Sequence, residues 1–302
     1  MKTLKQLGEF NFINAISKGC INHRSVVKGI GDDAAIVKIA KNSLLLFTSD
    51  MLIEDVHFTR KQSPESIGQK AINCSLSDIA AMGGMPLYAL ISVAFSKNLR
   101  IAFAKGIYRG MQKAAKKFGL SIIGGDTNSA DKIIIDVHIC GEAPGGKVVL
   151  RDGARKGDFI FVTGKLGGSY KGGHLDFTPR LKEARFLVDR YPVHAMIDIS
   201  DGLISDLGHI IEKSKKGAVL FQRSIPICRQ ADSLQDALYT GEDFELLFTV
   251  PEACADDLKR HWPFKKVKLT YIGKITAFDK GLLLEDENGR WKKAKRCGYR
   301  HF

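Results

Sequence analysis

The sequence lacks any run of about 18 uncharged apolar residues, the length that a membrane-spanning helix requires. Its first residues, MKTLKQLGEFNFINAI, also lack the apolar stretch and the small-residue cleavage site of a signal peptide. These two absences lead us to expect a cytoplasmic protein that has no membrane partner.

Paired cysteines are missing too. The chain has six cysteines, all of them single, with no CxxC pair and no cluster of histidines beside them. Structural zinc sites and disulfide frameworks draw on closely spaced ligands, so neither is indicated. We expect reduced thiols that mostly serve as packing groups, at Cys20, Cys74, Cys140, Cys228, Cys254 and Cys297.

Several familiar catalytic motifs are also absent: the GxxxxGK[ST] phosphate loop, the GxSxG elbow, the kinase HRD and DFG pair, and HExxH. The segment GIGDDA formally matches the dinucleotide pattern GxGxxA, in which a glycine loop opens a helix and presents N–H groups to a pyrophosphate. Here the following AAIVKIA is typical of a strand. Asp32 and Asp33 would also face the phosphates and repel them unless a metal ion lay between.

What the chain does contain is the composition of an ordinary globular protein, 44% hydrophobic and 26% charged, over 302 residues. That length favours two domains. The net charge of +13 raises the question of nucleic acid, but the densest basic runs, at 213–216, 265–268 and 291–296, are short and peripheral. Solvated faces are the simpler interpretation, and a basic field would also attract an anionic nucleotide.

Apolar β-type runs alternate with helical patterns in the first half, and a Gly-rich charged segment at 142–158 precedes a restart of the pattern. We therefore predict a two-domain α+β or α/β protein, with a mixed sheet and helices in 1–145 and an α/β domain in 146–302. The predicted strands are 34–39, 43–52, 87–95, 120–126, 132–143, 159–164, one within 195–215, 218–227, 245–251 and 271–275; the predicted helices are 67–82, 100–119, 181–189 and one within 195–215.

Acidic residues recur at strand ends, at glycine turns and on one helix face of this predicted arrangement. They are Asp33, Asp50, Asp78, Asp126, Asp198 and Asp201. A single Asp of this kind is most simply a turn residue that bonds its own backbone. Six together indicate a site for hard divalent cations such as Mg2+, which prefer carboxylate and hydroxyl oxygens.

Asp78 is the most informative of the six. Its neighbours in CSLSDIAAMGGMP are small or apolar, so its helix should be buried, and a buried charge must be paired or bound to a metal. A hydrogen-bonded structural Asp remains the alternative. In IIGGDT, two glycines before Asp126 let the backbone approach a ligand closely, although a hairpin turn would use them as well.

Eight segments together resemble the thiamine-monophosphate kinase family, in order and in approximate spacing. This family belongs to an ATP-binding superfamily with aminoimidazole ribonucleotide synthetase, selenophosphate synthetase and a hydrogenase-maturation protein. The resemblance runs from about residue 8 to the C-terminus, and its segments are GIGDDAAIV, TSDMLIEDVHF, NCSLSDIAAMGGMP, IIGGDT, LRDGARKGD, IDISDGLISDLGHI, GEDFELLFTV and GYRHF.

The resemblance implies ATP-dependent phosphorylation of thiamine monophosphate to thiamine diphosphate, with several Mg2+ ions. It also implies a homodimer that pairs its N-terminal sheets, with the C-terminal domain over the nucleotide. The implied metal ligands are Asp33, Thr48, Ser49, Asp50, Asp78, Asp126, Asp198 and Asp201. The implied ATP contacts are Tyr108, Gly125, Asp126, Arg151 and Ser200, the substrate contacts are His57, Glu242 and Tyr299, and the catalytic residues are Asp50, Asp78 and Asp126.

In such a reaction both reactants are anionic, so their mutual repulsion is the main obstacle. Metal ions held by carboxylates would neutralise and align them, and we expect in-line transfer without a phosphoenzyme. The acceptor oxygen is already ionised, so His57 is interpreted as a substrate contact rather than a base, with a structural histidine as the alternative. Glu242 is expected to pair with the cationic substrate rings and Tyr299 to stack on one, although a helix-start acid is the alternative for Glu242.

One segment departs from the resemblance. Residues 164–180 are shorter than expected and lack much of a helical segment, which would trim one side of the nucleotide cleft and leaves the roles of Lys171 and Arg180 open. Two other interpretations also stay open: an ATP-using enzyme of the same superfamily with another substrate, and a degenerate protein that only binds nucleotide or nucleic acid.

Overall fold

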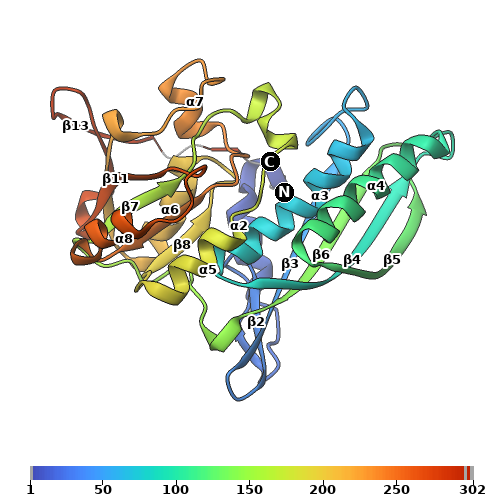
Figure 1. Ribbon diagram of the computed structural model, residues 1–302, viewed down its shortest axis with the longest axis horizontal. Helices are drawn as coiled ribbons and strands as arrows, with labels where there is room; N and C mark the ends of the chain where they lie inside the picture. Colours follow the sequence, from blue (N-terminus) through green and yellow to red (C-terminus); the bar gives the residue numbers. More distant parts are fainter. Residues whose placement is uncertain (1–2, 296–297, 300–302) are drawn as a thin grey trace.

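The computed structural model of the chain describes residues 3–295 and 298–299. Two β-sheets, one from each half of the sequence, lie side by side with helices packed on and between them (Figure 1). No helix in this described part of the chain has the length and apolar character needed to cross a membrane.

The first half forms a six-stranded sheet in the order β1-β2-β3-β6-β4-β5. Two long helices, α3 and α4, cover one face of it (Figure 1). The elements are β1 Val26–Lys28, β2 Ala35–Ala40, β3 Ser43–Ile53, α3 Pro64–Ala81, β4 Met85–Phe95, α4 Ile101–Phe118, β5 Ser121–Ser129 and β6 Ile134–Glu142.

The pairing in this sheet explains its sequence pattern. Strands β3, β6 and β4 pair antiparallel, whereas β4 and β5 pair in parallel through the crossover helix α4. Side chains alternate between the two faces, so Leu46, Ile91 and Val137 are buried under the helices. The opposite face has no helix over it among the described residues and carries exposed apolar side chains.

The second half forms a seven-stranded sheet in the order β13-β12-β9-β11-β7-β10-β8. Most of its pairs are antiparallel, and β12 with β9 is parallel. Its elements are β7 Phe159–Thr163, α5 Leu181–Arg190, β8 Ala195–Asp198, α6 Leu203–Ser214, β9 Gly217–Phe221, α7 Leu234–Tyr239, β10 Leu246–Val250, α8 Ala255–His261, β11 Leu269–Thr276, β12 Leu282–Glu285 and β13 Trp291–Lys293.

Both faces of this second sheet are buried, which is why its strands are continuous apolar runs. In β7, Phe161 faces a core shared with α3, α5 and the first sheet, whereas Ile160 and Val162 face a second core under α6. The shared core continues from Ile79 in the first half to Phe248 in the second. The two halves are therefore packed together rather than loosely linked.

The start of the chain lies against the second half. Helices α1 (Leu4–Leu7) and α2 (Glu9–Ser17) precede the first sheet in the sequence. However, the ring of Phe10 meets that of His209 in α6 edge-on, with centroids 4.8 Å apart. Sequence patterns did not predict this contact, nor strands β12 and β13.

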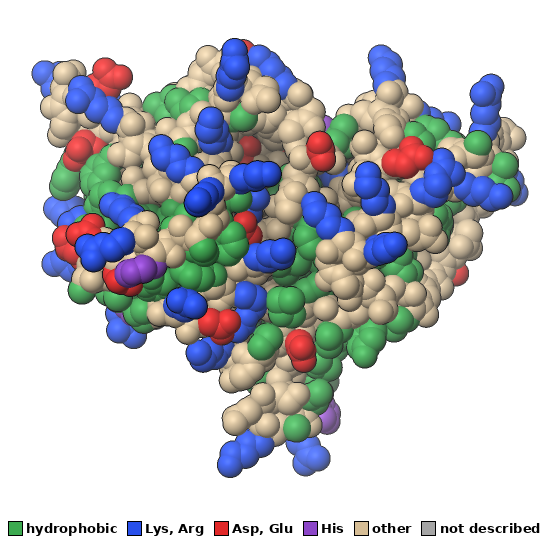
Figure 2. Space-filling model, viewed as in Figure 1, with side chains coloured by type: hydrophobic (Ala, Val, Ile, Leu, Met, Phe, Trp, Pro, Cys, Tyr) green, Lys and Arg blue, Asp and Glu red, His purple; other side chains and the backbone are tan. Residues whose placement is uncertain are grey.

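Most predicted elements are confirmed, with limited corrections. The predicted strand 218–227 is wrong beyond Phe221, where a 3-10 turn at Gln222–Ser224 follows β9. Asp50 and Asp126 lie inside β3 and β5 rather than at strand ends. On the face in Figure 2, Lys and Arg side chains are spread over both halves rather than gathered in one patch.

Candidate active site at the junction of the two halves

Three carboxylates from distant parts of the sequence meet where the two halves join. One oxygen each of Asp33, Asp78 and Asp198 lie within 4.8 Å of one another. Asp33 precedes β2 in the glycine turn, Asp78 lies in the last turn of α3, and Asp198 ends β8. We call these three residues the acidic group.

Each member of the acidic group is held by a donor. The Arg151 guanidinium donates to Oδ1 of Asp33 at 2.7 Å, and the Ser77 hydroxyl donates to Oδ2 of Asp198 at 2.6 Å. The hydroxyl of Thr48, on β3, donates to Asp78. These bonds fix the direction of the carboxylates without removing their mutual repulsion.

Burial and the repulsion between these carboxylates raise the pKa of two members of the acidic group, Asp198 and Asp78. Burial, together with the Asp33 carboxylate, raises the pKa of Asp198 to about 7. Burial also raises the pKa of Asp78 well above its ordinary value, and the carboxylates of Asp50, Asp198 and Asp33 add to this effect. A buried site that concentrates negative charge in this way is stabilised by a cation.

The donor set of the acidic group fits a hard divalent cation. Oδ2 of Asp33 is buried, and within the described residues no hydrogen bond reaches it. An orphaned carboxylate oxygen of this kind, beside two other carboxylates and the Thr48 hydroxyl, offers the oxygen ligands that Mg2+ prefers. Among the described residues, Cys and His take no part in this group, which argues against a softer metal.

Asp50 borders the acidic group from β3. Its Oδ2 accepts a hydrogen bond from the Ser75 hydroxyl at 2.8 Å, and burial raises its pKa. Its neighbour Ser49 points to the opposite face of the sheet, where its hydroxyl donates to Asp136 at 3.0 Å. The predicted ligands of β3 are thus divided between the two faces.

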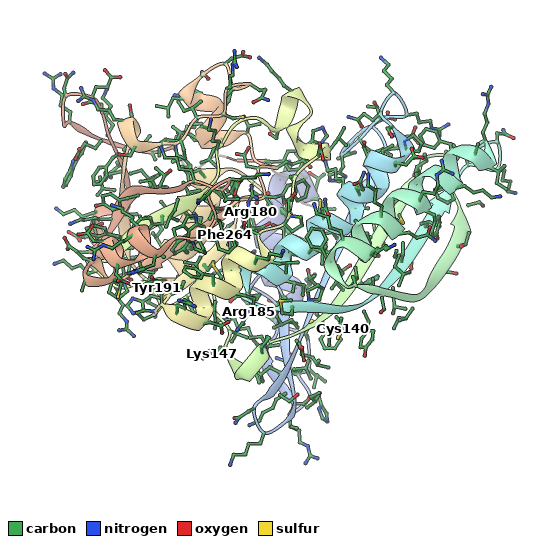
Figure 3. The ribbon with its side chains drawn as sticks, viewed as in Figure 1. Cys140, Lys147, Arg180, Arg185, Tyr191 and Phe264 are labelled. Atoms are coloured by element: carbon green, nitrogen blue, oxygen red, sulfur yellow. The ribbon has the colours of Figure 1, made fainter. Side chains whose placement is uncertain are left out.

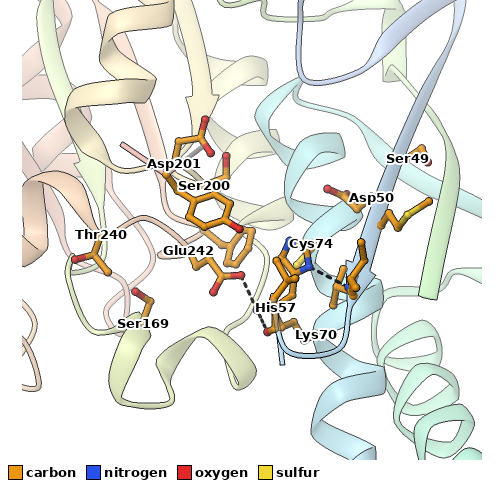
Figure 4. Close-up of a pocket in the computed structure, with 16 residues that line it drawn as sticks. Ser49, Asp50, His57, Lys70, Cys74, Ser169, Ser200, Asp201, Thr240 and Glu242 are labelled. Carbon is orange, nitrogen blue, oxygen red and sulfur yellow. Dashed lines mark hydrogen bonds and ion pairs between the residues drawn. The ribbon is translucent and has the colours of Figure 1, made fainter. Parts of the chain in front are cut away.

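Beside the acidic group lies a cavity of about 720 Å³ that both halves line (Figure 4). All three predicted substrate contacts, His57, Glu242 and Tyr299, line it. Asp50 and the predicted ATP contact Ser200 do so as well. We call this space the junction cavity; carboxylates and hydroxyls, such as those of Asp50 and Ser200, line it together with the aromatic rings of Phe244 and Tyr299.

The GEDFEL segment forms one wall of the junction cavity in an unusual backbone conformation. Glu242 and Phe244 have φ values of 54° and 50°, which only surrounding structure can impose on residues other than glycine. Their amides donate to the carbonyls of Ser200 and Ile199, both at 2.8 Å. Glu242 follows α7 and begins no helix, so the helix-start alternative is wrong for it.

Other side chains of this wall anchor the short segment 164–180. Asp243 accepts hydrogen bonds from the Gly167 amide at 2.9 and 3.0 Å. Arg180, labelled in Figure 3, binds Glu245 through two nitrogens at 2.7 and 2.5 Å. Where a longer helix was expected, the chain has two 3-10 turns, Ser169–Lys171 and Gly173–Leu175.

Asp201 belongs to a different group. Its carboxylate lies within 4.8 Å of Asp206 and His209 ligand atoms, on α6, rather than with the acidic group. Oδ2 of Asp206, inside α6, accepts the amides of Asp201 and Gly202, both at 3.1 Å, and so holds the turn that leads into this helix. The carbonyl of Asp201 also accepts the Tyr299 amide at 3.1 Å, which ties the C-terminal motif to the cavity.

Three predicted residues lie away from this junction. Tyr108 is on α4, and Gly125 and Asp126 are on β5, the edge strand of the first sheet. Among the described residues, the groups of three or more metal-binding side chains do not include Asp126. Arg151 borders a second cavity, of about 530 Å³, between α2, the glycine turn and α6.

Sequence reasoning missed Lys70 and His174, which both contact Glu242. Lys70 had a usable signal, since a lysine in the middle of a helix that is otherwise small and apolar has to be paired. His174 had none, because it lies in the segment that departs from the expected length.

Both halves of the chain are similar to known proteins. Residues 31–143 match the family model "AIR synthase related protein, N-terminal domain", and residues 155–282 match "AIR synthase related protein, C-terminal domain". The thiamine-monophosphate kinase of Buchnera aphidicola (Schizaphis graminum) is 37% identical over 97% of this chain and 99% of its own. The Bacillus subtilis enzyme of that name is 33% identical over 98% and 100%.

This chain belongs to the thiamine-monophosphate kinase family. A solved structure described as "AaThiL complexed with AMPPCP and TMP" superposes with a TM-score of 0.87 at 32% identity, covering 100% of this chain and 99% of the other. A structure of the hydrogenase-maturation protein HypE with ATP gives a TM-score of 0.68 at 21% identity, covering 87% and 88%, and shows the shared fold. Family membership and the two-domain fold, both predicted from motifs, are confirmed.

Proposed function

We propose that this protein phosphorylates thiamine monophosphate to thiamine diphosphate, with ATP as the phosphoryl donor and Mg2+ as the metal. The observation that carries the proposal is the position of the acidic group beside a cavity lined by all three predicted substrate contacts. The curated relatives named for this activity and the neighbour bound to AMPPCP and TMP support it.

The acidic group would hold the metal, with Asp50 and Thr48 at its border. Bound Mg2+ supplies charge neutralisation for two phosphate groups and stabilises the charge that develops on the transferred group. Arg151 is paired with Asp33 and would contact the phosphates of a nucleotide bound at this metal site. Asp50 and Ser200 both line the junction cavity, and the substrate phosphate would lie beside Asp50, which is next to Asp78 of the acidic group.

The geometry favours His57 as a donor to substrate. Its Nδ1 accepts the Ile53 amide at 3.0 Å, so the neutral ring carries its proton on Nε2. A proton held there suits a hydrogen bond to a phosphate oxygen of the substrate rather than proton abstraction. The acceptor phosphate is already ionised, so in-line transfer needs no strong base and no phosphoenzyme.

We propose further that the protein acts as a homodimer, in which the open faces of two N-terminal sheets pack together. The open face carries exposed apolar side chains on β3, β4 and β5, and Cys140 lies on the same face of the intervening strand β6, away from α3 and α4 (Figure 3). A contiguous exposed patch of this kind is typical of an interface. Its apolar members are Phe47, Met51, Tyr88, Leu90 and Ile123.

This pairing would also explain Asp126. In the sheet order, β5 lies three strand spacings from β3, roughly 14 Å at the usual spacing of about 4.8 Å. An Asp side chain does not span that distance to Asp50. Asp126 pairs with Ser92 and shares the open face with the predicted ligand Ser49, so in the dimer the Asp126 of one protomer would face Ser49 of its partner and add a metal ligand from the open side of β3.

We place the domain boundary near residue 145, as proposed from the sequence. The last strand of the first sheet ends at Glu142, and the first strand of the second begins at Phe159. The two family models end and begin at residues 143 and 155. These observations support domains 1–145 and 146–302, with α2 reaching across to the second.

The test is an ADP-release assay with thiamine monophosphate, thiamine and aminoimidazole precursors side by side, with Mg2+ and with EDTA. We expect turnover that requires both thiamine monophosphate and Mg2+. Turnover with another acceptor only would assign a different enzyme of the superfamily. Salt-sensitive nucleic-acid binding without any turnover would overturn the proposal in favour of a binding protein.

A further inference from the structure

Lys70 is a fully buried lysine at the floor of the junction cavity. Its side chain is 0% exposed, although it lies on α3 among small and apolar residues. Its ammonium contacts three different segments: the His57 carbonyl at 2.8 Å, His174 Nδ1 at 2.8 Å and Glu242 Oε1 at 2.5 Å. Figure 4 draws the link between Lys70 and Glu242 across the junction.

Proton counting fixes the role of each partner. A charged lysine carries three N–H donors and no acceptor, and three acceptors surround Lys70. His174 Nδ1 must therefore accept, so this imidazole is neutral and carries its proton on Nε2. Burial lowers the pKa of His174, and the Lys70 charge lowers it further, which agrees with a neutral ring.

The same counting leaves one oxygen of Glu242 without a strong donor from this cluster. Oε2 lies 3.4 Å from His174 Nδ1, but that nitrogen carries no proton to donate. The Glu242 side chain is 34% exposed and lines the cavity. Its charge is already balanced by Lys70, so it offers the cavity a hydrogen-bond acceptor rather than an uncompensated negative charge.

We propose that Lys70 is a positioning residue, which holds Glu242 as a neutralised hydrogen-bond acceptor for a neutral N–H donor of the substrate. This inference rests on the proposed function. In thiamine monophosphate the fitting donor is the amino group of the pyrimidine ring. The cationic thiazolium is then left to the aromatic rings of Phe244 and Tyr299, whose faces attract cations.

The proposal revises the expected pairing of Glu242 with a cationic ring. A paired carboxylate gains little from a second cation, because the Lys70 ammonium repels that cation at close range. The same carboxylate loses much binding free energy when the N–H donor of the ligand is replaced by an acceptor, because two acceptors then face each other with no proton between them.

The first experiment uses the unaltered protein. Binding of thiamine monophosphate is compared with that of oxythiamine monophosphate, in which a carbonyl replaces the amino group and the thiazolium is retained. We expect the dissociation constant to rise at least about tenfold, as loss of one hydrogen bond to a charged group predicts. Equal affinity for the two compounds would overturn the proposal.

The second experiment changes the lysine. In Lys70→Met the KM for thiamine monophosphate should rise at least about tenfold with the KM for ATP nearly unchanged, whereas Lys41→Met, at an exposed turn between β2 and β3, should alter neither. In the double variant Lys70→Met with Glu242→Gln, no buried charge is left unpaired and an amide oxygen can still accept, so much of the lost affinity should return.

An equal rise of both KM values in Lys70→Met, or no rescue in the double variant, would reduce Lys70 to a structural residue. If Lys70→Met does not fold, the analogue comparison still decides. Failure of the proposed function is distinct from all of these results, because the unaltered protein would then show no Mg2+-dependent turnover of thiamine monophosphate.

Discussion

The two faces of the first sheet carry acidic residues in opposite surroundings. On the inner side, Asp50 of β3 and Asp78 of the covering helix α3 are enclosed by helices and by the second half of the chain, and burial raises the pKa of both. On the outer face, Asp126 and Asp136 lie on strands with no covering helix among the described residues. Packing within one chain therefore buries the acidic residues of the inner side only. On the outer side, the acidic residues stay beside exposed apolar side chains.

Because the inner side holds the buried carboxylates, we expect substitutions there to lower the catalytic rate most. Asp78→Asn should lower kcat by at least about 10³-fold, because it removes a central oxygen ligand while keeping the size of the side chain. The metal-free protein should be as stable as the parent or more so, since a buried charge is lost. Steady-state kinetics measure the change in kcat, and thermal unfolding measures the change in stability. Near-normal activity would show that Asp78 is not a metal ligand.

Asp126→Asn should lower turnover by roughly 10²-fold or more and leave the fold intact, if the residue is a ligand. The sharper measurement mixes this variant with Asp78→Asn after unfolding and refolding together. In random dimers the mixture should recover about a quarter of the parent activity, because one site of each mixed dimer is then complete. Activity no higher than that of the separate variants would contradict a site shared between protomers.

Disruption of the open face should lower turnover about as much as Asp126→Asn does, because a monomer loses the Asp126 of its partner. Leu90→Asp places a charge in the exposed apolar patch, so the protein should become monomeric, as light scattering after size exclusion would detect. Ile21→Asp, at a side chain that is 98% exposed and outside the patch, is the matched control. A dimer that survives Leu90→Asp would place the interface elsewhere.

The smallest effect expected is on stability against pH. The folded pKa of Asp198 is about 7, above its ordinary value, so the metal-free folded state binds more protons than the unfolded state between about pH 4 and 7. Its stability should therefore fall as pH rises through this window, by up to about 1.4 kcal/mol per pH unit.

Denaturant titrations at several pH values measure this slope. In Asp198→Asn the fall of stability with pH should be smaller, because the contribution of Asp198 is gone. In the parent, Mg2+ should reduce the fall, because the cation favours the ionised form of Asp198. A parent and variant with the same slope would contradict the assigned pKa.

The sequence predicted the elements that have strong local signals. The long helices α3 and α4 and the apolar strands follow from periodicity, and glycine turns placed Asp33 at a strand start. The motifs also predicted that His57, Glu242 and Tyr299 belong to one site, and all three line the junction cavity.

What the sequence did not predict depends on contacts between distant segments. No local pattern indicates that Lys70 reaches Glu242 across the junction, or that α2 packs on α6. The positive φ of Glu242 is likewise imposed by bonds to Ser200 and to Lys70. Asp126 could be assigned to the metal site by resemblance, but only the strand order reveals its distance from Asp50 within one chain.

The most direct test of the central claim is a crystal grown with Mn2+ in place of Mg2+ and a non-hydrolysable ATP analogue, measured by anomalous scattering. The account predicts metal peaks bound by Asp33, Asp78 and Asp198, next to the phosphates of the analogue. Metal peaks at another place, with no metal bound to these three carboxyl groups, would contradict it.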